Sequence, residues 1–133
     1  MKLEQQVCSL ELAKKLKELG VKQESLFMWA PSKNGYGMEI RLKRKISFER
    51  SEFVYSAYTV AELGEMLPQI LKIKKIKYQL FVSVAVDKQW FVVYANEKDY
   101  SDNAPIKFMM CHNEADARAK MLVYLYENKL INK

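Results

Sequence analysis

The stretch that decides the fold is YQLFVSVAVDKQWFVVYA, residues 78–95. In residues 78–86, apolar side chains recur at every second position, as in a strand that buries one face. A polar turn, DKQ, separates this run from residues 90–95, in which both faces are apolar. The pattern predicts an antiparallel hairpin that lies in the middle of a sheet covered on both sides.

Helices are predicted on either side of this hairpin, near the two ends of the sequence. Residues 10–19 follow Ser9, a good N-cap, and end at Gly20, which suits the left-handed residue after a helix. Residues 114–127 follow the N-cap candidate Asn113 and carry a broad apolar stripe. Both segments are therefore expected to pack on the sheet.

A third, short helix is predicted in the middle of the chain. The sequence TVAE at residues 59–62 is a capping box, which begins a helix over residues 60–67. Pro68 ends it, because the residue before a proline avoids the helical conformation. Residues 69–75 (QILKIKK) fit either a helix or a strand.

Further strands are predicted at residues 25–30, 38–44, 48–58 and 106–110. An Asn-Gly pair within residues 32–37 indicates a hairpin turn. Residues 38–44 alternate, so Glu39, Arg41 and Lys43 are expected on a water-facing side. The predicted fold is one α+β domain over residues 1–133, an antiparallel sheet of four to five strands packed with two main helices and one short helix.

Composition fits a small globular domain, with 50% apolar and 29% charged residues. No apolar run approaches the ~20 residues of a membrane-spanning helix, and no signal-peptide core is present. The two cysteines are expected to be reduced thiols. We therefore expect a cytoplasmic protein without a cofactor, a metal or a membrane partner.

No recognisable catalytic set is present. Cys111 and His112 are adjacent, but neighbouring residues of a strand point to opposite faces, which disfavours a thiol–imidazole pair. Glu62 and Glu65 lie three residues apart, and Glu62 is already assigned to the capping box. Three Cys and His residues in total are too few for a usual structural zinc site. The prediction is a protein that is not an enzyme.

The net charge of +6 is unevenly placed, since residues 1–78 carry 15 Lys and Arg against 9 Asp and Glu. Phosphate-neutralising charge beside aromatic residues is typical of nucleic-acid binding. Solvated strand edges rich in lysine explain the same pattern. The candidate nucleic-acid-binding residues are Arg41, Lys43, Arg44, Lys45, Lys72, Lys74, Lys75 and Lys77.

The chain is also rich in residues that are common at protein interfaces, with eight Tyr, six Phe, two Trp and seven Met. They fit either an ordinary aromatic core or a surface for a partner. The leading functional hypothesis is a non-enzymatic accessory protein that binds a protein partner or itself. The alternative is a nucleic-acid-binding module that uses residues 41–50 and 72–77.

Three runs of sequence, taken together, resemble a known group. They are VCSLELAKKLKELGVKQESLF (residues 7–27), YTVAELGEMLP (58–68) and NEADARAKMLVYLYENKLI (113–131). The group they resemble consists of small uncharacterised proteins encoded by bacterial phages, prophages and related mobile elements. The resemblance implies a bacterial cytoplasm and a phage or mobile-element role, and it assigns no site residue.

Overall fold

The computed structural model describes residues 2–45, 53–96 and 108–132. Within these ranges the strands and helices follow one another in mixed order. They are α1 (Leu10–Glu18), β1 (Phe27–Pro31), β2 (Met38–Leu42), β3 (Tyr55–Ser56), α2 (Val60–Met66), β4 (Ile70–Ile73), β5 (Ile76–Val84), β6 (Trp90–Ala95), β7 (Met109–Cys111) and α3 (Glu114–Glu127). The described ranges also contain the short 3-10 helices Leu3–Gln5 and Lys43–Lys45.

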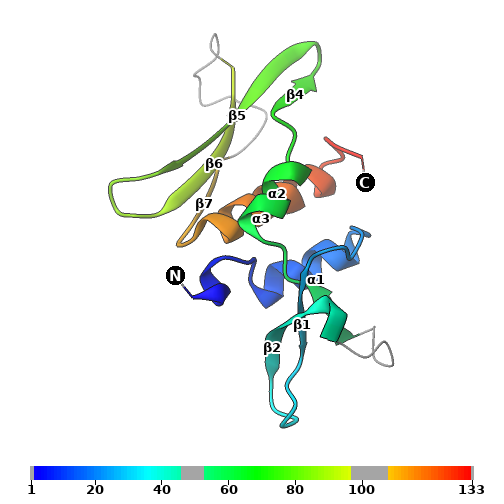
Figure 1. The fold of residues 1–133 in the computed structure, drawn as a ribbon. Helices are drawn as coiled ribbons and strands as arrows, with labels where there is room; N and C mark the ends of the chain where they lie inside the picture. The colour runs from blue at the N-terminus through cyan, green and yellow to red at the C-terminus, as the bar shows by residue number, and fades with distance from the viewer. Residues whose placement is uncertain (1, 46–52, 97–107, 133) are drawn as a thin grey trace.

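The strands form two antiparallel sheets, with the helices between them (Figure 1). The smaller sheet has the order β2-β1-β3, and the larger has the order β4-β5-β6-β7. Helix α3 packs on β6 and β7, α1 and α2 pack on α3, and α1 also contacts β3. The α+β class with antiparallel strands is confirmed. The strands form two sheets rather than one, and the helix layer lies between them.

The predicted helix ends are present in the structure. The side chains of Ser9 and Asn113 each accept a hydrogen bond from the backbone N–H three residues on, as N-caps do. Gly20 has a φ of 84°, and the Val21 N–H donates to the Leu16 carbonyl at 3.0 Å. This bond satisfies a carbonyl that the end of α1 would otherwise leave free.

Glu62 joins α2 to the start of β1. Its carboxylate accepts from the Thr59 N–H at 2.8 Å, which completes the predicted capping box. The same carboxylate accepts from the Ser25 hydroxyl at 2.8 Å and from the Leu26 N–H at 3.1 Å. Strand β1 begins at Phe27 rather than at residue 25, since the two residues before it are bound to Glu62.

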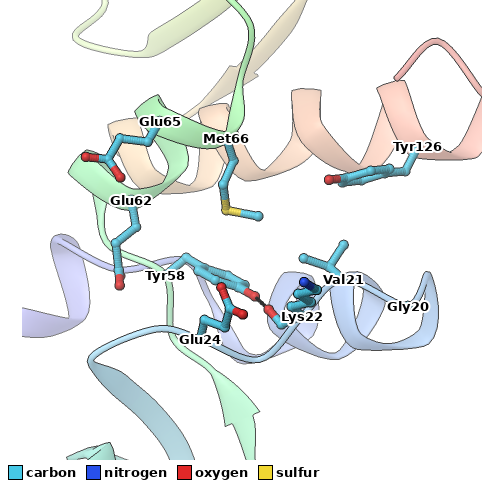
Figure 2. Close-up of a pocket in the computed structure, with 9 residues that line it drawn as sticks. All are labelled: Gly20, Val21, Lys22, Glu24, Tyr58, Glu62, Glu65, Met66 and Tyr126. Carbon is cyan, nitrogen blue, oxygen red and sulfur yellow. Dashed lines mark hydrogen bonds between the residues drawn. The ribbon is translucent and has the colours of Figure 1, made fainter. Parts of the chain in front are cut away.

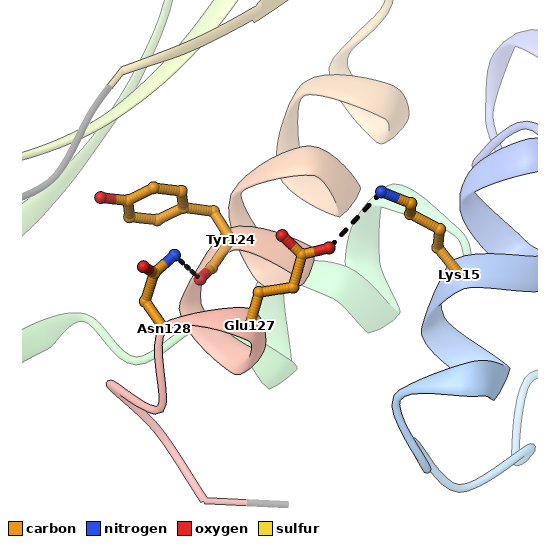
Figure 3. Close-up of polar contacts among 4 residues, drawn as sticks. All are labelled: Lys15, Tyr124, Glu127 and Asn128. Atoms are coloured by element: carbon orange, nitrogen blue, oxygen red, sulfur yellow. Dashed lines mark hydrogen bonds and ion pairs between the residues drawn. The ribbon is translucent and has the colours of Figure 1, made fainter.

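Two exposed polar contacts lie at the end of α3 (Figure 3). Lys15 of α1 forms an ion pair with Glu127 of α3, with 3.4 Å between Nζ and Oε1. The Asn128 side chain donates to the Tyr124 carbonyl at 2.8 Å, which caps the helix. Exposed ion pairs add little stability, so the helices are held mainly by their buried apolar residues.

The prediction that one side of residues 38–44 faces water is wrong. Arg41 lies opposite Met28 and Glu39 lies opposite Ala30 in the register of β1 and β2. Directly paired residues share a face, and Met28 and Ala30 are buried. Every residue of β2 is half-buried, because alternation separates two faces without showing which of them the fold covers.

The larger sheet buries one face against the helices. Leu80, Val92 and Tyr94 point to that side and are buried in the main core with residues of α3. Strands β5 and β6 are central, so the predicted mid-sheet position is confirmed. Phe81, on the opposite side, is 46% exposed. The prediction that both faces are covered is therefore wrong for the described part of the chain, because all three helices lie between the sheets (Figure 1).

The remaining strands are shorter than expected. Residues 69–75, for which the sequence allows a helix or a strand, contain strand β4. Leu71 of β4 lies opposite the buried Tyr78 of β5. Of the predicted strand at residues 48–58, the structure shows β3, and residues 48–52 lie outside the described ranges. The strand predicted at residues 106–110 is observed as β7, and residues 106–107 are also outside those ranges.

Candidate binding surface

Four lysines gather at one end of the larger sheet, on the hairpin that joins β4 to β5 (Figure 1). Lys72 of β4 and Lys77 of β5 lie directly opposite each other. Lys74 and Lys75 form the two-residue turn between these strands. All four residues are exposed, and we call this group the basic hairpin.

The backbone of the basic hairpin is unfavourable for lysine. Lys74 has a φ of 49° and Lys75 a φ of 70°, both in the left-handed region. Two-residue turns of this kind favour Asn-Gly, and a left-handed conformation costs other residues about 1–2 kcal/mol each. Like charges directly opposite each other, here Lys72 and Lys77, are also destabilising. Local stability therefore does not explain this sequence.

The side of the larger sheet that faces away from the helices adjoins the basic hairpin. Met110 on this side is 37% exposed, and Phe91 and Val93 are half-buried. The sequences of strands β4 to β7 contain no Asp or Glu. We call this side the open face, and its outward residues include Lys72, Lys77, Phe81, Phe91, Val93 and Met110.

The first predicted basic segment has a different setting. Arg41 forms an ion pair with Glu39, with 3.7 Å between Nε and the carboxylate, and its side chain is 24% exposed. The Lys43 ammonium donates to the Gln23 carbonyl at 2.9 Å. Arg44 is exposed in the 3-10 helix that follows β2. Two of these charges are thus engaged within the fold.

The two predicted basic segments are not brought together. Arg41 belongs to β2 of the smaller sheet and Lys43–Lys45 form the 3-10 helix directly after it, whereas residues 72–77 belong to the larger sheet. Figure 1 shows the two sheets on opposite sides of the helices. The eight candidate residues therefore do not make one continuous surface, and the basic hairpin lies apart from residues 41–45.

The two thiols have different surroundings. Cys8 is fully buried, and burial raises the pKa of its thiol to about 12. Cys111 is half-buried, and with the exposed His112 it lines an open groove of about 620 Å³. Asp116 in this groove accepts from the Ser9 N–H at 2.7 Å. This carboxylate thus connects α3 to α1.

A second open pocket, of about 370 Å³, lies between α2 and the segment after α1 (Figure 2). Its polar side chains include Glu62, which holds the start of β1, and Tyr58, whose hydroxyl donates to the Lys22 carbonyl. Burial raises the pKa of Tyr58 to about 12, so it stays protonated at neutral pH. Glu65, three residues after Glu62, is exposed. Glu62 and Tyr58 are thus both engaged in hydrogen bonds within the fold.

Metal ligands and membrane spans are not found in the described ranges. No three side chains of His, Cys, Asp or Glu there are grouped so that they could hold a metal ion. None of the helices described is both long and apolar enough to cross a membrane.

No protein-family model matches this chain, and no curated protein or solved structure does. The resemblance to phage and mobile-element proteins consequently remains a prediction.

Sequence reasoning identifies the lysines of the hairpin but not the aromatic residues beside them. The prediction places Phe81 and Phe91 inside a sheet covered on both sides. One signal in the sequence points the other way: Lys77, Gln79 and Ser83 share the strand face of Phe81. Polar residues at three of four positions indicate a face that meets water.

Proposed function

We propose that this protein is a non-enzymatic binding protein that binds nucleic acid with its basic hairpin. The observation that carries the proposal is the placing of four exposed lysines on one two-residue turn and its flanking strand pair. Lysine ammonium groups neutralise phosphates and release counterions, which supplies most of the affinity of non-specific nucleic-acid binding.

The unfavourable local energetics of the hairpin support this proposal. Left-handed Lys74 and Lys75 and the opposed Lys72 and Lys77 destabilise the free protein. A polyanion between the lysines replaces repulsion by attraction. Strained residues that persist without a structural reason are common at functional sites. The absence of acidic residues from strands β4 to β7 favours an anionic ligand further.

Fluorescence anisotropy with short labelled DNA and RNA, at low and high salt, tests the proposal. The double substitution Lys74→Asn/Lys75→Gly removes two charges and inserts the sequence that the turn prefers. We expect weaker binding and a salt-dependence slope reduced by about 2, one unit for each phosphate that a lysine no longer neutralises. A variant that binds as tightly as the natural chain would contradict the proposal, as would no binding at low salt.

Lys88→Gly is the matched control. Lys88 is also left-handed, with a φ of 65°, and it lies in the turn between β5 and β6. That turn is at the other end of β5, whose nine residues span about 30 Å. The control therefore removes a lysine and the same backbone strain without touching the basic hairpin, and we expect its binding to change little.

A second candidate function is association with another protein or with a second copy of this chain. The exposed apolar residues of the open face favour it, since Met and aromatic residues are enriched at interfaces. Sedimentation velocity tests self-association, and a strictly monomeric chain at high concentration would contradict it. We also propose, for either candidate function, an accessory role in a phage or mobile element and a location in the bacterial cytoplasm.

A further inference from the structure

Two aromatic rings lie on neighbouring central strands of the open face. Phe81 of β5 is opposite Val93 of β6, and Phe91 is opposite Ser83. Phe81 and Phe91 are thus diagonal neighbours, and such residues lie about 7–8 Å apart, within reach of aromatic side chains. The two rings form a short row across the two central strands.

This aromatic row lies on the same face as part of the basic hairpin. Lys77, Gln79 and Phe81 occupy every second position along β5, so their side chains lie on the same side of the sheet. Phe81 is four residue steps along the strand from Lys77, a distance of about 13 Å. A short extended polymer can therefore contact the lysines and the rings at once.

We infer that the ligand of this surface is single-stranded nucleic acid, an inference that depends on the proposed function. Its phosphates contact the basic hairpin, and its unpaired bases stack on Phe81 and Phe91. Stacking needs bases that are free of a partner strand, because those of a duplex are stacked on each other. The hairpin alone offers a duplex only phosphate contacts.

Charge favours nucleic acid over a mainly apolar protein as the occupant of the open face. Apolar side chains by themselves fit either ligand. The strands of this sheet carry lysine but no acidic residue, and Lys72 faces Lys77 directly. Phosphates and bases complement such a combination of charge and rings, whereas a mainly apolar partner leaves these ammonium groups without a counter-charge.

The test compares a labelled single strand of about 12 nucleotides, a length within the usual site size, with a duplex of the same sequence. Phe81→Leu keeps an apolar side chain but removes the ring, and Phe81→Tyr keeps the ring. Phe81 is 46% exposed, so both variants should fold, which circular dichroism can check. We expect the single strand to bind more tightly than the duplex. Phe81→Leu should weaken single-strand binding roughly tenfold, leave duplex binding unchanged, and differ from Phe81→Tyr, which should bind like the natural chain.

Other outcomes separate this inference from the proposed function. Equal binding of both probes, with no effect of Phe81→Leu but weaker binding by Lys74→Asn/Lys75→Gly, would overturn the inference and keep the proposed function. No binding of either probe at low salt would overturn both. Self-association that Phe81→Leu abolishes, without nucleic-acid binding, would assign the open face to a second copy of the chain and overturn the inference.

Discussion

Replacing the turn of the basic hairpin should make the protein more stable while it weakens binding. The change is Lys74→Asn/Lys75→Gly, at two residues with φ values of 49° and 70°. Relief of the left-handed conformation is worth about 1–2 kcal/mol per residue. Glycine reduces this gain by about 0.5–1 kcal/mol, because it makes the unfolded chain more flexible. Asparagine relieves only part of the strain. We expect a net gain of about 1–2 kcal/mol in the free energy of unfolding.

Urea unfolding followed by circular dichroism measures this gain. The midpoint should rise with an unchanged slope, since the folded surface stays the same. For a domain of this length the thermal midpoint should rise by about 3–8 °C. Lys88→Gly, which relieves one left-handed lysine in place of two, should give a smaller gain. Unchanged or lower stability of the double variant would refute the argument that the hairpin lysines are strained.

Three further outcomes are expected. Glu62→Ala should lower the free energy of unfolding by about 2–4 kcal/mol, because three donors lose their acceptor. The control Glu65→Ala, at an exposed residue, should change it by less than about 0.5 kcal/mol. Equal effects of the two variants in urea unfolding would contradict the role of Glu62 in joining α2 to the start of β1. Burial raises the pKa of the Cys8 thiol from 9.0 to about 12 in the folded chain. The unfolded chain therefore loses this proton at a lower pH than the folded chain does. The thiol's contribution to the free energy of unfolding is thus complete below pH 9 and declines as pH rises toward 12. Thermal melts of Cys8→Ala should therefore show a shallower alkaline decline, and an identical decline would exclude this cause. Lys15→Ala should change stability by less than about 1 kcal/mol, since its ion pair with Glu127 is exposed; a larger loss in urea unfolding would show that the pair matters.

The helices could be predicted in detail from the sequence, because their signals are local. Ser9, Asn113 and the capping box of α2 act on amides three residues away, and Gly20 ends α1 through its own backbone. The central hairpin was predictable for the same reason, since alternation shows directly which residues share a face.

The sequence could not show how the faces are covered. Residues of β2 and β5 alternate alike, yet β2 is half-buried on both sides and β5 leaves one side open. The second role of Glu62, as acceptor for residues 25 and 26, also depends on a contact between distant segments.

The sequence by itself determined the helices, the central hairpin and the presence of two basic segments. Only the tertiary structure decided that these segments lie apart and that the second one joins two phenylalanines on an open face. The physical reason is range. Caps and alternation depend on neighbours a few residues away, whereas exposure depends on which distant elements pack against each face.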